Sequence, residues 1–373
     1  MLSEKSAESI ICEDLDFICD ELRDEFVQLL GKKLLIVGGA GFLGYYLVQA
    51  ALHLNEGTPD SKSVEVTVFD NFIRGVPDWL TQLEVNPSLQ IIRHDITQPL
   101  PADLPAFDFV IHAASIASPT YYRKFPIQTM DANVSGLRLI LDYCLKQRDE
   151  GSPVSGILYF STSEIYGDPT PENIPTSETY RGNVSCTGPR ACYDESKRYG
   201  ETLCVNFAQQ FDLPVRIARP FNNYGPGLKI TDKRVLPDFA RDVLGGRDIV
   251  MLSDGSPTRT FCYIADAIVG YFKVLILGRN GESYNIGTER PEISIAELAK
   301  RVVEASSRLF GYEGKVVKQN SQESDYLVDN PSRRCPLISK AREELGFDPK
   351  IGIVEGLDRA LCWYRENSEA EEA

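Results

Sequence analysis

The feature that most constrains the fold of this chain is the alternation of short apolar segments with helical patterns over residues 32–220. A strand-like segment, KKLLIV, precedes GGAGFLG and the helical pattern YYLVQAALHL. Five later segments have the composition of buried strands: VEVTVFD, LQIIRHD, FDFVIHAAS, GILYFSTS and LPVRIARPF. Because strands that alternate with helices form parallel sheets, the pattern predicts an α/β fold, a Rossmann-type doubly wound parallel sheet.

The sequence divides into three parts. Residues 12–30 carry apolar side chains at helical spacing and end before Gly31, which predicts an N-terminal helical extension over 1–31 that packs on the body or on a partner chain. Residues 32–220 form the predicted dinucleotide-binding domain, which we expect residues 260–288 to rejoin. Residues 221–373 have Pro- and Gly-rich loops and short charged helices, which predicts a smaller, mainly substrate-binding lobe with an acidic tail at 366–373.

Charge and cysteine content exclude several classes of function. The formal net charge of −15 argues against binding to nucleic acid or to an anionic membrane, since both need a basic face. No apolar run reaches membrane-spanning length, and the acidic N-terminus lacks the basic region of a signal peptide. Nine cysteines without a C-x-x-C motif indicate reduced thiols in a cytoplasmic protein. The three histidines are scattered, so no metal site is expected.

GGAGFLG is the candidate cofactor loop. It places Gly38, Gly41 and Gly44 between a strand and a helix, where small residues let backbone N–H groups approach a pyrophosphate. Asp70 ends the next strand, where a carboxylate can accept hydrogen bonds from both ribose hydroxyls and repel a 2′-phosphate. NAD is therefore favoured over NADP, although Arg74 could soften that preference. Asp95 either reaches the adenine or caps the end of its strand.

Tyr193 and Lys197 form the candidate catalytic pair. In a helix, residues four apart share one face, about one turn apart. An ammonium beside a phenol lowers the pKa of the phenol, and a phenolate available near neutral pH is a general base. Since Tyr-x-x-x-Lys often arises by chance, the pattern alone does not separate a catalytic pair from two surface residues.

Several further motifs make residues 32–365 resemble the extended short-chain dehydrogenase/reductase family: the helix around Asn133, STSEIYGDP, YDESK, RPFNNYGPG and SPTRTF. Members of that family act on nucleotide sugars and keep NAD bound through a full catalytic cycle. HAASIASPTYY, GPRACYDESKR and RRCP resemble its UDP-glucuronate decarboxylases, which make UDP-xylose. The resemblance implies an NAD-dependent lyase that oxidises C4 of UDP-glucuronate, releases the C6 carboxylate as CO2 and reduces C4 again.

The resemblance also implies the roles of individual residues. Tyr193 takes the proton of the sugar 4-hydroxyl, Lys197 holds the phenolate and the nicotinamide ribose, and Thr162 hydrogen-bonds the same hydroxyl. Ser163, Glu164 and Arg334 complete the catalytic set, with the last two positioning the ring and managing protonation at C5. The cofactor-binding residues implied are Gly38, Gly41, Phe42, Leu43, Gly44, Asp70, Asn71, Asp95, Ile96, Ala113, Tyr193 and Lys197. The substrate-binding residues implied are Ser118, Tyr122, Asn222, Arg259 and Arg334.

The residues after Thr162 bear on the second chemical step. Where dTDP-glucose 4,6-dehydratases carry Asp-Glu, this chain has Ser163-Glu164, and a serine delivers a proton to a leaving hydroxyl less well than a carboxylic acid does. A carboxylate beta to a ketone needs no such acid to leave as CO2. GDP-mannose 4,6-dehydratases resemble a Ser-Glu arrangement, so a dehydratase stays open as an alternative. A C4 epimerase is less favoured because those enzymes typically lack the glutamate, and Glu164 could also simply cap a helix.

Three arginines are candidate contacts for anionic groups, because a guanidinium pairs well with a diphosphate; they are Arg219, Arg259 and Arg334. The family resemblance further implies a homodimer through helices that begin near Pro126 and Tyr193, with the apolar face of LRLILDYCL buried between subunits. A regulator that binds NAD on the same fold without catalysis is the non-enzymatic alternative. The set of Thr162, Tyr193 and Lys197 speaks against it.

Overall fold

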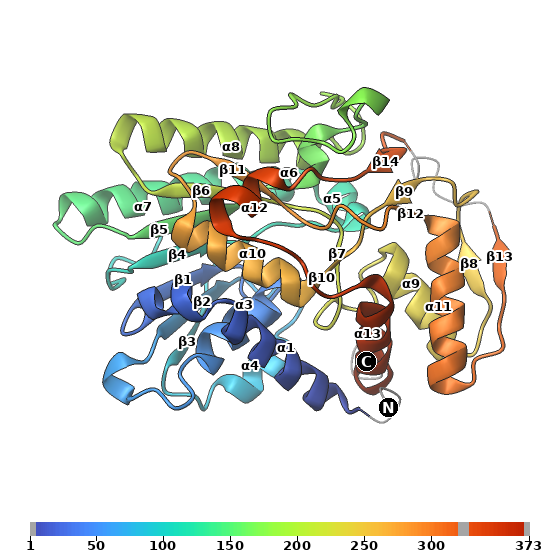
Figure 1. Ribbon diagram of the computed structural model, residues 1–373. Coiled ribbons are helices and arrows are strands. Elements are labelled where there is room, and N and C mark those ends of the chain that lie inside the picture. Colours follow the sequence, from blue (N-terminus) through green and yellow to red (C-terminus); the bar gives the residue numbers. More distant parts are fainter. Residues whose placement is uncertain (1–4, 320–327, 369–373) are drawn as a thin grey trace.

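A seven-stranded sheet forms the centre of the computed structural model, which describes residues 5–319 and 328–368 (Figure 1). The strand order is β11-β6-β5-β4-β1-β2-β3, and every neighbouring pair is parallel, as predicted for a Rossmann-type sheet. The last residues of the expected acidic tail lie outside the described residues. The strands are β1 (Lys33–Val37), β2 (Glu65–Asp70), β3 (Leu89–Arg93), β4 (Phe109–His112), β5 (Gly156–Phe160), β6 (Val215–Pro220) and β11 (Ser283–Ile286).

Helices cover both faces of this sheet. On one face lie α3 (Phe42–His53) and α10 (Ile264–Leu277), and on the other α7 (Leu137–Asp149) and α8 (Ala191–Phe211) (Figure 1). Strand β1 shows why both faces must be covered, because Leu34 and Ile36 pack in one core cluster while Leu35 and Val37 pack in the other. Successive side chains of a strand point to opposite faces, so a fully apolar strand requires a layer on each side.

The helix expected around Asn133 is interrupted. Helix α6 (Pro126–Asp131) passes through a π-helical turn, Ala132–Gly136, before α7 continues. Asn133 is fully buried in that turn, and its Nδ2 donates to Ser196 Oγ on α8 at 2.9 Å. A π turn adds a residue to the helix, and here it brings a polar side chain against the helix that carries Tyr193. The short helices nearby are α4 (Asp78–Leu83) and α5 (Pro119–Lys124).

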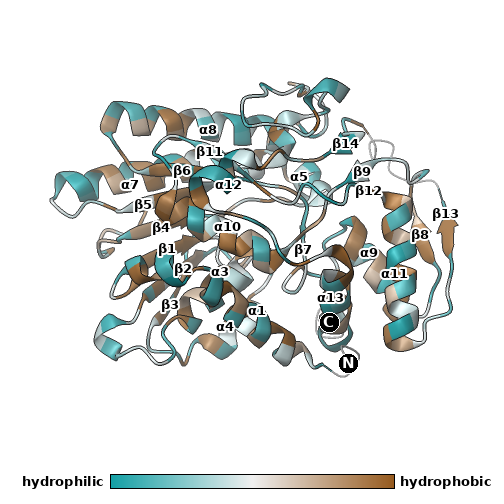
Figure 2. Cartoon of the chain, viewed as in Figure 1, coloured by the Kyte–Doolittle hydropathy of each residue, from teal (hydrophilic) through white to brown (hydrophobic). Residues whose placement is uncertain are grey.

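The remaining elements form a smaller lobe beyond the carboxyl ends of the large sheet. Its helices are α9 (Val235–Leu244), α11 (Ile295–Phe310) and α13 (Ile353–Asn367), whereas α12 (Ser339–Leu345) packs on α10 and on strand β11 of the large sheet. Its short strands are β7 (Asn223–Tyr224), β8 (Ile249–Met251), β9 (Thr258–Arg259), β10 (Cys262–Tyr263), β12 (Ile293–Ser294), β13 (Val316–Lys318) and β14 (Arg333–Arg334). Figure 2 shows the paired strands β8 and β13 as hydrophobic beside the amphipathic α11. The described residues also contain 3-10 turns at η2 (Val27–Leu29), η3 (Asp60–Lys62), η5 (Ser163–Tyr166) and η6 (Pro171–Asn173).

The N-terminal extension is part of the core. Its helix α1 (Ala7–Glu21) begins earlier than the pattern over 12–30 predicts, and it breaks at Leu22 before the short α2 (Arg23–Phe26). It packs on α3, α10 and α13 (Figure 1). Asp14 of α1 is fully buried and accepts hydrogen bonds from the hydroxyls of Tyr46, at 2.5 Å, and Tyr263, at 2.6 Å. Arg359 of α13 pairs with the other carboxylate oxygen. A buried carboxylate with these partners ties the extension to both halves of the molecule.

Candidate active site

A single cavity of about 950 Å³ runs along the carboxyl ends of β1, β2, β4 and β5 and into the smaller lobe. Doubly wound sheets bind ligands at this edge. The predicted catalytic, cofactor-binding and substrate-binding residues all line this cavity. They are Gly38, Gly41, Phe42, Leu43, Gly44, Asp70, Asn71, Asp95, Ile96, Ala113, Ser118, Tyr122, Thr162, Ser163, Glu164, Tyr193, Lys197, Asn222, Arg259 and Arg334.

The glycine loop joins β1 to α3 in a conformation that side chains would block. Gly38 has φ +82°, and a Cβ there would lie 2.5 Å from the backbone nitrogen of Ala114. A Cβ on Gly44 would lie 2.1 Å from the carbonyl oxygen of Gly39. The N-cap position of α3 is Gly41, which has no side chain to cap the helix, so the first turn presents backbone N–H groups to the cavity. That arrangement suits a pyrophosphate.

Asp70 links β2 to the glycine loop. One carboxylate oxygen accepts from the N–H of Ala40 at 3.0 Å and the other from the N–H of Phe72 at 2.8 Å. Burial raises the pKa of Asp70. Its carboxylate stands at the end of its strand, where ribose hydroxyls can donate to it. Asp95 accepts from the N–H and the hydroxyl of Thr97, so it caps the end of its strand and also lines the cavity.

Thr162, Tyr193 and Lys197 lie together at the centre of the cavity. Tyr193 and Lys197 occupy the first two turns of α8, and both are buried. The ammonium of Lys197 donates to the carbonyl of Phe160 at 2.7 Å and lies 5.9 Å from the centre of the Tyr193 ring. Thr162 follows β5, accepts from the N–H of Glu164 at 3.2 Å and hydrogen-bonds Tyr193. The hydroxyl, phenol and ammonium groups are thus brought to one place by a strand end and a helix start.

The pKa values of Tyr193 and Lys197 differ from those that the sequence led us to expect. Burial raises the pKa of Tyr193 to about 12, against the opposing effect of its hydrogen bond with Thr162, and burial lowers the pKa of Lys197 to about 7. The prediction that Lys197 by itself lowers the pKa of the phenol is therefore wrong. Removal from water disfavours both charged forms, and it outweighs an ammonium that is directed at a backbone carbonyl.

Glu164 is held between two guanidinium groups. Its Oε2 lies 2.5 Å from Arg334 Nη2 and also pairs with Arg190 Nη2. Burial by itself would raise the pKa of Glu164, but Arg190 and Arg334 outweigh it and lower the pKa to about 2. Asp194 lies 3.6 Å from Arg190, and burial together with the charge of Glu164 raises the pKa of Asp194 to about 7. Glu164 is therefore charged at neutral pH, while Asp194 is partly protonated.

Arg259 and Arg334 both line the cavity, but they differ in whether their N–H groups already have hydrogen-bond acceptors. Arg259 donates to the carbonyls of Thr258 and Pro331 at 2.7 and 2.6 Å, and burial together with the charge of Arg334 lowers its pKa to about 9. The Nε of Arg334 is buried without a hydrogen-bond partner in the described part of the chain. Arg259 therefore mainly braces the β9 segment, whereas Arg334 has a free donor for a ligand.

The expected substrate-binding residues lie beside this cluster. Tyr122 stacks on Tyr193, and its buried hydroxyl has no hydrogen-bond partner among the described residues. Asn222 has φ +43°, donates to the carbonyl of Thr260 at 2.9 Å and accepts from Arg334 at 3.4 Å. Ser118 is buried and donates to the backbone carbonyl of Asp232 at 2.8 Å.

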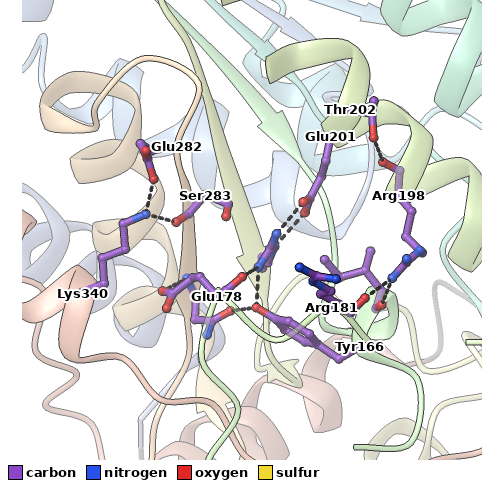
Figure 3. Close-up of polar contacts among 12 residues, drawn as sticks. Tyr166, Glu178, Arg181, Arg198, Glu201, Thr202, Glu282, Ser283 and Lys340 are labelled. Carbon is purple, nitrogen blue, oxygen red and sulfur yellow. Dashed lines mark hydrogen bonds and ion pairs between the residues drawn. The ribbon is translucent and has the colours of Figure 1, made fainter. Parts of the chain in front are cut away.

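Arg219 is placed away from the cavity. Its guanidinium binds both carboxylate oxygens of Glu201, at 2.8 and 2.5 Å, and the hydroxyl of Tyr166 at 2.6 Å. It also donates to the carbonyl of Glu178 at 3.0 Å. Figure 3 shows Glu201, Tyr166 and Glu178 as they lie around this ion pair. With these partners Arg219 joins α8 to β6 and is not available to a nucleotide, which corrects its proposed role as an anion contact.

Arg190 is a residue of the site that the sequence motifs did not indicate. It is buried, pairs with Glu164 and lies within the cavity lining, one position before α8 begins. Helical spacing was the available signal, because Arg190, Asp194 and Lys197 recur at intervals of four and three. His112 is also buried, and burial together with the charge of Lys197 lowers its pKa to about 3. It is therefore neutral at physiological pH.

Neither a metal centre nor a membrane-spanning helix is found among the described residues. No group of three or more His, Cys, Asp or Glu side chains in that part of the chain is arranged to hold a metal ion. Within the same residues, none of the helices combines the length and apolar character needed to cross a membrane.

Comparisons with known proteins agree with this geometry. The chain is 37% identical to UDP-glucuronic acid decarboxylase 6 of Arabidopsis thaliana over 325 residues, which are 87% of this chain and 86% of that protein. It is 34% identical to UDP-glucuronic acid decarboxylase 1 of Xenopus tropicalis over 91% of this chain and 73% of that protein.

Among solved structures, the fold matches a double mutant of the dTDP-glucose 4,6-dehydratase of Streptomyces venezuelae with NAD bound. The TM-score is 0.77, the identity 26%, and the match covers 91% of this chain and 98% of that one. The model of the "NAD dependent epimerase/dehydratase family" matches residues 34–287, which include the glycine loop, Thr162, Tyr193 and Lys197. The chain is an enzyme of the NAD dependent epimerase/dehydratase family.

Proposed function

We propose that this enzyme converts UDP-glucuronate into UDP-xylose and CO2. The observation that carries the proposal is the cluster around Glu164, in which three arginines, Arg190, Arg259 and Arg334, face two carboxyl groups. Three guanidinium groups against two carboxyl groups leave an excess of positive charge at neutral pH, and the raised pKa of Asp194 increases that excess. A buried excess of positive charge beside Tyr193 suits a sugar that bears a carboxylate. The sequence relatives named as decarboxylases support the same reading.

The residues of the cavity divide the first step between them. NAD, when bound, supplies the hydride acceptor and a positive charge that favours the phenolate of Tyr193. Tyr193 takes the proton of the C4 hydroxyl as hydride leaves C4, and Thr162 fixes the orientation of that hydroxyl. Lys197, with a pKa of about 7, gains or loses its proton easily near neutral pH and stabilises the phenolate when charged.

The second step needs a ketone and a carboxylate. With C4 oxidised, the C6 carboxylate lies beta to the ketone, so the C5–C6 bond can break with its electron pair moving to the C4 oxygen. The hydroxyls of Thr162 and Tyr193 are placed to hydrogen-bond that oxygen, while Arg334 meets the carboxylate. Glu164, with a pKa of about 2, carries no proton at neutral pH. We therefore assign Glu164 to the positioning of Arg190 and Arg334, and the proton that C5 gains after CO2 leaves is taken up from solvent.

Mass spectrometry of the sugar nucleotide tests the proposal. Purified enzyme with NAD and UDP-glucuronate is expected to give a UDP-pentose, one carbon and two oxygens lighter than the substrate. UDP-, dTDP- and GDP-hexoses run in parallel would identify a 4,6-dehydratase by the loss of one water with all carbons retained. Unchanged mass with an altered C4 configuration would identify an epimerase. Either of these results, or no turnover of UDP-glucuronate, contradicts decarboxylation.

We also propose a homodimer that forms through α6 and α8. These helices pack together and leave Ile127, Met130 and Tyr199 exposed, with 63%, 42% and 54% of each residue accessible. The LRLILDYCL face is not available for this contact, because Leu137, Ile140, Leu141 and Cys144 are buried inside the chain. Light scattering should give twice the chain mass, and Ile127→Glu with Tyr199→Glu should give a monomer. A wild-type monomer at micromolar concentration contradicts the proposal.

A cytoplasmic location is proposed from the thiols. Cys12 and Cys186 are free thiols that lie exposed on the surface. Free exposed thiols persist where the compartment is reducing. Fractionation of cells that express the tagged protein tests this, and recovery with secreted or organellar markers would contradict it.

A further inference from the structure

An ion pair joins two loops on opposite sides of the cavity. Arg74 follows β2 on the cofactor side, and Asp232 lies between β7 and α9 in the smaller lobe. Arg74 Nη1 lies 2.7 Å from Asp232 Oδ1, although 158 positions separate the two residues. The second carboxylate oxygen lies 2.9 Å from Arg234 Nε. Arg74, Asp232 and Arg234 all line the cavity that also contains Asp70.

Further contacts hold both ends of this pair. The guanidinium of Arg74 lies over the ring of Tyr121 on α5, 4.9 Å from its centre. Lys229, in the same loop as Asp232, donates to the carbonyl of Arg74 at 3.3 Å. Ser118, just before α5, donates to the backbone carbonyl of Asp232. Three segments that are distant in the sequence, the loop after β2, the start of α5 and the β7–α9 loop, are thereby tied together.

The exposure of the two side chains places the pair at the mouth of the cavity. The Arg74 side chain is 40% exposed, whereas the Asp232 side chain is 5% exposed. One partner therefore faces solvent and the other faces the interior. The sequence also left open that Arg74 binds the 2′-phosphate of NADP. A guanidinium that is bound to Asp232 and lies over the ring of Tyr121 is not free to do so.

We propose that Arg74 and Asp232 form a strap that retains the reduced cofactor while the sugar is a ketone. The inference rests on the proposed function, in which the hydride taken from C4 returns to C4 of the same sugar. Between these steps NADH must stay bound, since its loss would leave a 4-keto sugar with no reductant. A contact between the cofactor loop and the substrate lobe opposes departure of NADH without touching the reacting atoms, so Arg74 and Asp232 are positioning residues.

The test is the dissociation rate of NADH in the absence of any sugar. Enzyme loaded with NADH is mixed with excess NAD, and the loss of bound-NADH fluorescence is followed for wild type, Arg74→Met, Asp232→Asn and the double variant. We expect NADH to dissociate about 10-fold faster from each single variant than from wild type. The double variant should release NADH at the same rate as the single variants, since both changes remove the same contact. Rising salt should speed release from wild type but not from Arg74→Met, because salt screens a half-exposed pair.

The matched control is Arg308→Met. Arg308 is also a half-exposed arginine bound to a buried aspartate, with Arg308 51% and Asp358 4% exposed, but neither residue lines the cavity. This variant should release NADH at the wild-type rate. Unchanged dissociation in folded Arg74→Met and Asp232→Asn, or effects that add in the double variant, would overturn the strap.

A second measurement separates this inference from the proposed function. With UDP-glucuronate, the strap variants should release a larger share of product as the 4-keto pentose than wild type does. If wild type does not turn over UDP-glucuronate, the proposed function fails while the NADH dissociation result still decides the strap. If turnover occurs and the share of keto product is the same in all variants, the strap does not retain NADH during the reaction.

Discussion

The ring of Tyr122 stacks on the ring of Tyr193, with the ring centres 5.0 Å apart and the planes inclined by 10°. The stack joins α5 to α8 and fixes the plane of the phenol that is proposed to take the sugar proton. The guanidinium of Arg190 lies 5.9 Å from the Tyr122 ring on the same side of the cavity. The proposed base is thus oriented by a residue from another helix as well as by Thr162.

Tyr193→Phe should lower turnover by roughly 10²-fold or more, because it removes the general base while keeping the stacked ring. Steady-state kinetics with UDP-glucuronate measures the effect, and cofactor content confirms that the site is intact. Tyr199→Phe on the same helix is the control, since Tyr199 is 54% exposed and does not line the cavity. Near-normal turnover by an NAD-loaded Tyr193→Phe enzyme would reject the assignment.

Arg334→Met should reduce kcat/KM for UDP-glucuronate by about 10- to 100-fold, the range that corresponds to one charged hydrogen bond of roughly 1.5–3 kcal/mol. Binding of UDP alone should change little, because the affected contact is with the carboxylate. Calorimetry with UDP and with UDP-glucuronate separates the two. An equal loss for both ligands would show that Arg334 acts on the nucleotide or on the fold.

Lys197→Met should stabilise the protein stripped of cofactor at neutral pH. The pKa of Lys197 is lowered to about 7 in the folded chain, whereas an exposed lysine titrates near 10.5. Between these values the unfolded chain binds more protons, so wild-type stability rises with pH from about 7 to 10.5. Methionine removes this cost, which gives a gain on the order of 4 kcal/mol at pH 7.

That gain should nearly disappear by pH 10.5, where Lys197 is neutral in the folded chain and only half-protonated in the unfolded chain. Thermal melts across this pH range compare wild type, Lys197→Met and Lys146→Met, an exposed lysine whose change should have little effect. A stability difference that does not vary with pH would show that Lys197 is charged inside the folded chain.

Asp14→Ala should destabilise the chain by roughly 3–5 kcal/mol, because it leaves Arg359 and two tyrosine hydroxyls without their buried acceptor. Urea unfolding followed by tryptophan fluorescence reports the loss through Trp363 of α13. Asp20→Ala on the same helix is the control. Asp20 is 71% exposed and pairs with an exposed arginine, so its removal should cost less than 1 kcal/mol. Equal effects of the two changes would show that the Asp14 cluster contributes no special stability.

The sequence was sufficient for features that depend on local pattern. The central strands β1, β4 and β5 of the large sheet are buried on both faces, so their apolar runs are continuous and easy to recognise. The glycine loop could be located because Gly38 and Gly44 meet backbone atoms that leave no room for a side chain. Tyr193 and Lys197 lie one turn apart on α8, so their proximity follows from helix geometry alone.

Contacts that depend on the tertiary fold could not be predicted from local sequence patterns. Glu164 and Arg334 are 170 positions apart, and Arg74 and Asp232 are 158 apart, so their pairing requires the folded lobe. Arg219 meets Glu201 only because α8 runs beside β6. The direction of the Tyr193 pKa shift was wrong because the sequence does not give the extent of burial. Asp14 lies on a helix whose acidic residues suggest exposure, yet Tyr46 and Tyr263 bury it.

The ion pair between Asp14 and Arg359 can form only late during synthesis of the chain. Arg359 is made 345 residues after Asp14, so the carboxylate gains its charged partner only when the last helix has left the ribosome. The first helix to be made is therefore among the last to complete its packing, because its contacts with α13 form at the end of synthesis although α3 and α10 can cover it earlier. A ribosome-bound chain that stops before α13 should hold α1 in a protease-sensitive state, and the completed chain should protect it.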